Sequence, residues 1–177
     1  MKIFVAAPFT QWLQQGGGSV PDTYRVWLEE LHEALRAGGH DVISAHEREA
    51  WGDDLEPASS ALRADLESIL SCDVLVAELG NPPSPGVQME LGVALVAGKR
   101  IVVLAQVGAP IPYLVTGLES VGDAKVLYYE DPQTVLGAVS KLLSRRTRAS
   151  RPRSPDNGGA KSVSASSPRR RRPTRST

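Results

Sequence analysis

The sequence predicts an α/β protein with a doubly wound, five-stranded parallel sheet between two layers of helices, as in flavodoxin-like or Rossmann-like three-layer sandwiches. Two observations lead to this prediction. Five short apolar runs alternate with segments of helical periodicity, which is typical of parallel strands joined by crossover helices. The runs are nearly continuous in Val, Ile, Leu and Ala, as expected for strands covered on both faces.

Residues 2–7 form the first predicted strand, and a long loop at residues 8–22 follows. We expect Phe9 and Trp12 to be exposed in this loop. Loops of such length inside a domain are usually functional or mobile. Asp22 or Thr23 caps the next predicted helix. Its apolar positions include Val26, Trp27, Leu31 and Leu35.

Gly38 and Gly39 end that helix, and residues 40–45 form the second strand. A polar stretch at residues 46–54 leads to a helix at residues 57–71. Its predicted apolar face consists of Leu62, Leu66, Ile69 and Leu70, and Asp65 lies beside this face.

Residues 72–77 form the third strand, and a helix over residues 87–97 ends at Gly98. The fourth strand covers residues 100–105. The chain then continues through a Pro-containing loop, a short helix at 113–118, a fifth strand at 125–129 and a last helix at 131–143.

A net charge of zero hides a sharp division of the chain into an acidic body and a basic tail. Of 20 basic and 20 acidic residues, 11 basic and one acidic fall in residues 145–177, which leaves 9 basic and 19 acidic in residues 1–144. The tail is rich in Arg, Ser and Pro and has almost no large apolar side chain, so we predict one domain at 1–144 and a disordered tail at 145–177. Its four consecutive arginines could contact nucleic acid non-specifically, but no aromatic residues or folded reading motif predict a specific nucleic-acid partner.

Other features point to a cytoplasmic protein that needs neither a metal nor a cofactor. The single cysteine, Cys72, excludes an internal disulfide, and residues 1–7 lack the long apolar region of a signal peptide. No apolar run is long enough to cross a membrane. Three scattered histidines lack metal-ligand spacing, and the glycine-containing loop lacks the Lys-Ser/Thr pair of a P-loop.

The connection after the third strand, Asn-Pro-Pro-Ser-Pro-Gly-Val-Gln-Met-Glu-Leu-Gly at residues 81–92, is the strongest candidate site. A loop that opens a helix presents backbone N–H groups to a phosphate. We expect Glu90 in the first turn of that helix, where the positive helix end favours its ionised form and makes it a candidate nucleophile. The local sequence leaves another interpretation open, in which Ser84 only caps the helix and Glu90 only interacts with the helix dipole.

Three blocks of sequence resemble a known family. Asp65, residues 73–78 and residues 83–92 together resemble the nucleoside 2-deoxyribosyltransferase superfamily, and within it the nucleoside 5′-monophosphate N-glycosidases. Residues 46–52 and 114–120 look like those of the cytidylate hydrolases of the mildiomycin and blasticidin S pathways. The resemblance covers residues 2–143 and implies the same α/β fold.

The resemblance also implies roles for individual residues. Glu90 attacks the anomeric carbon and displaces the base, and water then hydrolyses the glycosyl-enzyme. Asp65 contacts or protonates the leaving base. Nucleotide-binding roles fall to Phe4, Phe9, His46, Ser84, Gly86 and Thr116. Thr116 reaches the phosphate of a neighbouring subunit, so a homodimer with shared active sites is implied.

Two departures from the family pattern bear on the substrate. Phe4 stands where many relatives have Tyr, so any hydroxyl role there is lost. Thr10 stands where the hydroxymethyl-cytidylate hydrolase has Arg, which leaves the preferred base open.

Alternatives remain open for single residues. Asp65 could be an exposed helix carboxylate, and His46 could simply end a strand. Trp51 could pack under its loop, and Arg48 could form a surface ion pair instead of a phosphate contact.

Three functions follow from the sequence. The first is hydrolysis of a pyrimidine nucleoside 5′-monophosphate, CMP or a 5-substituted CMP. The second is deoxyribosyl transfer between bases, which the basic tail argues against because transferases use residues near a neighbour's C-terminus to bind a nucleoside. The third is non-catalytic nucleotide binding, which would require neither Glu90 nor Asp65.

Overall fold

The computed structural model describes residues 1–144, and the predicted basic tail at 145–177 lies outside the described residues. Five parallel strands form one sheet in the order β2-β1-β3-β4-β5. The strands are β1 (Lys2–Ala6), β2 (Asp41–Ser44), β3 (Val74–Glu78), β4 (Arg100–Gln106) and β5 (Ala124–Tyr129). The predicted doubly wound α/β sandwich is therefore confirmed.

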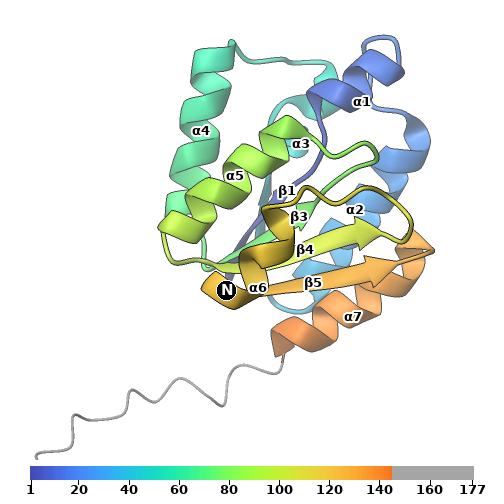
Figure 1. Cartoon of the computed structure of the whole chain (residues 1–177). Coiled ribbons are helices and arrows are strands. Elements are labelled where there is room, and N and C mark those ends of the chain that lie inside the picture. Colours follow the sequence, from blue (N-terminus) through green and yellow to red (C-terminus); the bar gives the residue numbers. More distant parts are fainter. Residues whose placement is uncertain (145–177) are drawn as a thin grey trace, which may run out of the picture.

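Helices cover both faces of the sheet (Figure 1). The α-helices are α1 (Thr10–Gln15), α2 (Asp22–Ala37), α3 (Ala45–Arg48), α4 (Ala58–Ser71), α5 (Pro85–Val96), α6 (Leu118–Val121) and α7 (Pro132–Ser144). Two 3-10 helices, η1 (Ala50–Gly52) and η2 (Val115–Gly117), complete the elements of residues 1–144.

Alternate strand residues contribute to two separate cores. Val74 and Val76 of β3 pack with α2 and α7, whereas Leu75 and Ala77 pack with α4, α5 and α6. This alternation is the period-two consequence of a pleated strand buried on both faces. It explains why the strands read as continuous apolar runs.

The strand order creates a crevice beside β1. The chain leaves β1 on one side to form β2 and returns across it to form β3, so the helices after β1 and β3 lie on opposite faces. Ligands in open parallel sheets bind outside the carboxyl ends of the strands at such a reversal. The described helices include none that is both long and apolar enough to span a membrane.

The loop predicted at residues 8–22 is partly wrong, because it contains α1. Trp12, expected to be exposed, retains only 2% of its accessible surface. Its ring stacks on Tyr24 at a centroid distance of 4.4 Å and joins the core under α2. Neither Asp22 nor Thr23 caps α2, which begins at Asp22 after Pro21.

The predicted apolar face of the fourth helix is only partly buried. Ile69 is fully buried, but Leu62 and Leu70 remain 43% and 59% exposed. Because α4 packs chiefly against α5 rather than flat on the sheet, only part of its apolar face is covered by other elements. On α2, Val26 is likewise exposed, although Trp27, Leu31 and Leu35 are buried as expected.

Candidate active site

A cavity of about 730 Å³ lies beside the carboxyl end of β1, enclosed by α1, α3, α4 and α5. Seven residues that the sequence predicted for the site line this one cavity, from five separate segments of the chain. They are Phe4, Phe9, His46, Asp65, Ser84, Gly86 and Glu90. Thr116 does not line it; it is exposed on η2, and its hydroxyl donates to the Tyr113 carbonyl of the same turn at 2.6 Å.

The N-terminus of α5 forms one end of the cavity. Ser84 is the N-cap residue, and its Oγ accepts a hydrogen bond from the Val87 N–H at 3.5 Å. Ser84 therefore does cap the helix, but this role leaves the hydrogen of its hydroxyl free to make a further bond. An N-cap hydroxyl that accepts one bond can still donate its own hydrogen to an anion, and Gly86 lets a ligand approach the backbone closely.

Glu90 lies on the second turn of α5, five residues after Pro85 opens the helix, so its predicted place in the first turn is wrong. The helix dipole acts mainly within the first turn, and here burial dominates. Burial, reinforced by the negative charge of Asp65, raises the pKa of Glu90 to about 8, opposed only by the positive charge of Arg48. The expectation that the helix end keeps this carboxyl ionised is therefore also wrong.

Asp65 projects from α4 into the same cavity and is held by Arg48. The Arg48 Nη1 donates to Asp65 Oδ1 at 2.9 Å, and the Asp65 side chain is 19% exposed. Burial raises the pKa of Asp65, while the hydrogen bond and charge of Arg48 oppose the rise. Asp65 is thus a partly buried, ion-paired carboxylate rather than an exposed helix residue.

Arg48 gathers three carboxylates at the edge of the cavity. Besides Asp65, it donates from Nη2 to Glu49 at 3.0 Å, and its Nε lies 3.6 Å from a carboxylate oxygen of Glu56. Of the two roles considered for Arg48, an ion pair is present, although the side chain is only 22% exposed. Glu49 and Glu56 also line the cavity and were not among the predicted site residues. The sequence signals for them were their place after the second strand and, for Glu49, its position in the resembling block at residues 46–52.

The cavity is lined by acidic side chains and by no basic Lys or Arg of the described residues. Four carboxyl side chains line it, from Glu49, Glu56, Asp65 and Glu90. No group of three or more His, Cys, Asp or Glu in this part of the chain is arranged to hold a metal ion. Within one chain, the α5 N-terminus with Ser84 is therefore the main feature that favours an anion.

His46 forms an aromatic wall of the cavity with Phe9. Its ring centroid lies 4.5 Å from that of Phe9, and its Nε2 donates to the Pro8 carbonyl at 3.3 Å. Burial lowers the pKa of His46 to about 4, so the imidazole is neutral at pH 7. A neutral imidazole whose Nε2–H is already bonded to a carbonyl is better suited to packing against a substrate than to proton transfer. Trp51 packs under its loop, 5.7 Å from His46 between ring centroids.

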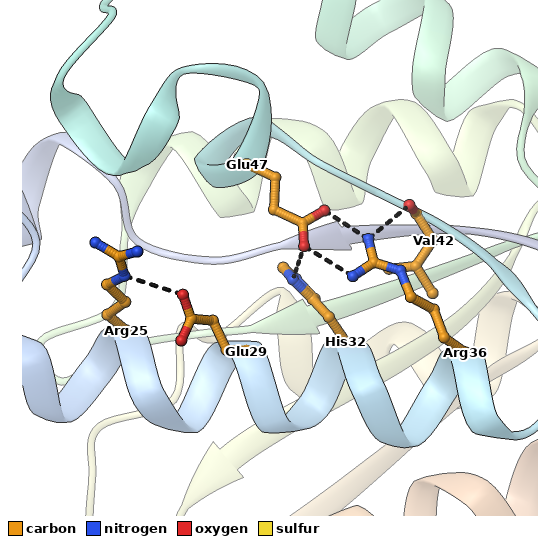
Figure 2. A network of polar contacts seen from close by, with 6 residues as sticks. All are labelled: Arg25, Glu29, His32, Arg36, Val42 and Glu47. Carbon is orange, nitrogen blue, oxygen red and sulfur yellow. Dashed lines mark hydrogen bonds and ion pairs between the residues drawn. The ribbon is translucent and has the colours of Figure 1, made fainter.

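A charged network behind the cavity fixes the helix that carries His46 and Arg48. Glu47, the residue between them in the chain, is bonded to Arg36 and His32 of α2 (Figure 2). It accepts two hydrogen bonds from Arg36, at 2.6 and 2.9 Å, and one from His32 at 3.1 Å. The bond from Arg36 holds the pKa of Glu47 below its ordinary value. Because α3 is only four residues long, these bonds to α2 stabilise a helix that could not persist alone.

Comparisons with known proteins agree with this fold. A family model described as nucleoside 2-deoxyribosyltransferase matches residues 18–142. The solution structure of BlsM has a TM-score of 0.71 and 31% identity, over 85% of this chain and 97% of BlsM. No curated protein matches the chain.

Two other solved structures share the fold at lower identity. The CMP N-glycosidase BcmB of Clostridium botulinum has a TM-score of 0.63 and 22% identity, over 80% of this chain and 99% of BcmB. A 2-deoxyribosyltransferase of Bacillus psychrosaccharolyticus has a TM-score of 0.55 and 23% identity, over 79% and 96%.

Proposed function

Because this chain belongs to the nucleoside 2-deoxyribosyltransferase family, whose members are enzymes that act on nucleosides or nucleotides, we propose a specific reaction for it. It hydrolyses the N-glycosidic bond of a pyrimidine nucleoside 5′-monophosphate, CMP or a 5-substituted CMP, to the free base and ribose 5-phosphate. One observation carries the proposal. Two carboxyls with raised pKa values, Glu90 and Asp65, line one cavity that ends at a capped helix N-terminus.

In the first step the ionised Glu90 carboxylate attacks C1′ of the sugar, and the bond from C1′ to the base breaks. The electron pair of that bond stays on the base, which takes a proton from Asp65. In the second step water attacks C1′, loses a proton to Asp65 and releases Glu90. Such a pair of displacements retains the configuration at C1′.

The proton distribution that these surroundings favour is the reverse of the one that this chemistry uses. Glu90 has its pKa raised to about 8, so it is mostly protonated at pH 7, whereas Arg48 favours ionised Asp65. The reactive form has the single proton on Asp65 and the negative charge on Glu90. A bound phosphate and sugar must therefore favour this second arrangement of the same proton.

The phosphate end of the site favours a second copy of the chain as partner. A phosphate dianion usually gathers several donors, and this cavity offers Ser84 and a helix end but no lining Lys or Arg from residues 1–144. Tyr113 and Leu114, beside Thr116, are 88% and 84% exposed, which is unusual for large apolar side chains. We propose a homodimer in which this segment packs on the partner and Thr116 completes the partner's phosphate site.

The preference for a cytosine nucleotide is supported by a likeness of fold to the CMP N-glycosidase BcmB. Deoxyribosyl transfer remains the second candidate, supported by the family itself and by the likeness to a 2-deoxyribosyltransferase. A non-catalytic nucleotide-binding role is less well supported, because it gives no reason for two carboxyls to share the cavity.

One experiment separates these functions. The protein is incubated with CMP, dCMP, UMP, their nucleosides, and each of these together with a second free base, and released and exchanged bases are quantified. Hydrolysis predicts free cytosine and ribose 5-phosphate from CMP, with far slower release from cytidine. A new nucleoside formed only when the second base is present would show a transferase, and no base release from any compound would leave binding alone.

A further inference from the structure

The last residue of β3, Glu78, is a buried carboxyl that the proposed chemistry does not use. Its side chain lies on the α2 and α7 side of the sheet, the side opposite the catalytic cavity, and is 4% exposed. A carboxyl in such surroundings is costly unless its bonds contribute to the structure or to function. Glu78 directly precedes the connection that carries Ser84 to the start of α5.

Two hydrogen bonds join Glu78 to that connection and to a distant strand. Its Oε1 accepts from the Gly80 N–H at 3.1 Å and from the Tyr129 hydroxyl at 2.9 Å, and its Oε2 has no partner among the described residues. Gly80 has a φ of +81°, and a Cβ there would come within 2.5 Å of Pro8 Cγ. The turn therefore has one conformation that Glu78 stabilises from behind.

Tyr129, which donates to Glu78, is itself held in place by its neighbours. The ring of Tyr129, the last residue of β5, stacks against Trp27 of α2 at a centroid distance of 6.1 Å. The Trp27 indole donates in turn to the Pro132 carbonyl at the start of α7, at 3.2 Å. Elements behind the sheet thus fix the position of the Tyr129 hydroxyl.

The same turn determines where the phosphate end of the cavity lies. The Ser84 N–H donates to the Leu79 carbonyl at 2.8 Å, which closes the turn that Gly80 begins. Ser84 then caps α5 through Val87. A displacement at Gly80 would therefore move the Ser84 hydroxyl and the helix N-terminus together.

We propose that Glu78 and Tyr129 are positioning residues for the phosphate-binding end of the site, acting from the opposite face of the sheet through the Gly80–Ser84 turn. The phosphate ligand in this inference rests on the proposed function. The stabilisation of the Gly80–Ser84 turn by Glu78 and Tyr129 does not depend on that function.

The choice of variants follows from the chemistry of the carboxyl. Burial raises the pKa of Glu78 to about 7, opposed by the bonds from Tyr129 and Gly80, so both protonation states occur near neutral pH. Either state has an oxygen that accepts from Gly80 and Tyr129. The Glu78→Gln variant keeps such an oxygen and should preserve the turn, whereas Tyr129→Phe and Glu78→Leu remove a partner. Tyr128→Phe is the matched control, because it deletes the same hydroxyl from a neighbouring side chain that is 61% exposed.

The first readout is kinetic. We expect Tyr129→Phe and Glu78→Leu to raise the KM for CMP about tenfold, a fold-change equal to the loss of one positioned charge-assisted hydrogen bond. Their kcat should fall less than about threefold, and their kcat/KM for cytidine should change little. Glu78→Gln and Tyr128→Phe should remain near wild type. A general loss of folding would instead lower kcat for both substrates together.

The second readout is backbone amide exchange over residues 79–87, which needs no substrate. We expect faster exchange there in Tyr129→Phe than in wild type, Tyr128→Phe or Glu78→Gln, with unchanged exchange in β1 and β4. Unchanged exchange in Tyr129→Phe would refute the claim that Tyr129 stabilises the Gly80–Ser84 turn. Faster exchange with an unchanged KM for CMP would overturn its link to phosphate binding. If wild type releases no base from CMP, the proposed function fails, and inorganic phosphate binding by the same variants then decides the inference.

Discussion

At the scale of single residues, the environments of Glu90 and Asp65 differ although both face one cavity. Glu90 has no cation bonded to it among the described residues, and burial together with the charge of Asp65 raises its pKa to about 8. Asp65 has Arg48 at 2.9 Å, which opposes the effect of burial. Pairs of carboxyls whose pKa values are pushed apart are a recurrent feature of glycosidase sites.

Replacing Glu90 by Gln should lower the rate of base release from CMP by at least about a thousandfold, because the amide cannot serve as the nucleophile. The fold should gain stability at alkaline pH. The pKa of Glu90 is raised on folding, so its ionisation costs wild type stability progressively between its ordinary pKa of 4.5 and about pH 8, and Gln abolishes this cost. We expect thermal denaturation to give a melting temperature at least about 3 °C above wild type at pH 8.5, and little difference at pH 4.5. Near-normal turnover by this variant would contradict the nucleophile assignment.

The kcat/KM for CMP should decrease above about pH 8. The reactive enzyme contains one proton in the pair of Glu90 and Asp65, and that proton is lost as pH rises through the upper pKa of about 8. The acidic limb should lie above the ordinary pKa of Asp, because burial raises the pKa of Asp65. In Asp65→Asn the remaining activity should instead rise with pH, since ionised Glu90 is then the only requirement. A wild-type profile without an alkaline limb between pH 7 and 9 would refute this account.

At the scale of elements, the connection from β3 to α5 serves two purposes. Ser84 ends the turn and caps α5, and the same hydroxyl lines the cavity. Opposite it, Glu47 fixes α3 to α2 (Figure 2). Arg48 of the same short helix pairs with Asp65. A turn and the short helix α3 therefore carry Ser84 and Arg48, whereas the long helices α4 and α5 carry Asp65 and Glu90.

Two substitutions at Ser84 should separate capping from phosphate binding. Ser84→Ala removes the cap and the ligand, and should cost ~1 kcal/mol in the free energy of unfolding and raise the KM for CMP. Ser84→Asp keeps an effective cap but places a carboxylate beside the phosphate, so stability should stay near wild type while the KM for CMP rises more steeply. Denaturant unfolding and steady-state kinetics check both. Equal KM values in Ser84→Asp and wild type would remove Ser84 from the phosphate site.

At the scale of the whole molecule, several large apolar side chains are left uncovered. Leu62, Met89, Tyr113 and Leu114 are between 43% and 88% exposed. Met89 and Leu62 also line the cavity. A partner that covers such residues would bury apolar area and close part of the cavity, which is the physical basis of the proposed dimer.

Mixed dimers should recover activity from two inactive parents. Glu90→Ala removes the nucleophile, and Thr116→Trp blocks the segment proposed to reach the partner's site. In a fully exchanged equal mixture, half the dimers are mixed and each has one site free of both lesions, so roughly a quarter of wild-type activity should return. Differently tagged subunits verify the exchange. No recovery after demonstrated exchange would place the whole site within one chain.

The sequence by itself determined the number of strands, the alternation of strands with the long helices, and the edge of the sheet where the cavity lies. Each strand is an apolar run that the hydrophobic effect buries, and the connections after β2 and β3 are short, so His46 and Ser84 had to lie near strand ends. Glu90 was identified from its place after the third strand and Asp65 from the resemblance to a family, and the cavity brings them together.

Only the tertiary structure decided the protonation and the partners of these groups. Arg48 and Asp65 are 17 residues apart and Glu78 and Tyr129 are 51 apart, and no local pattern shows that such pairs meet. Local rules also gave the wrong result for Trp12, which α2 covers, and for Glu90, whose helix-dipole interaction is weaker than the cost of burial. Burial and charge–charge distance are properties of the packed chain, so pKa values and ion pairs follow from the fold rather than from neighbours in sequence.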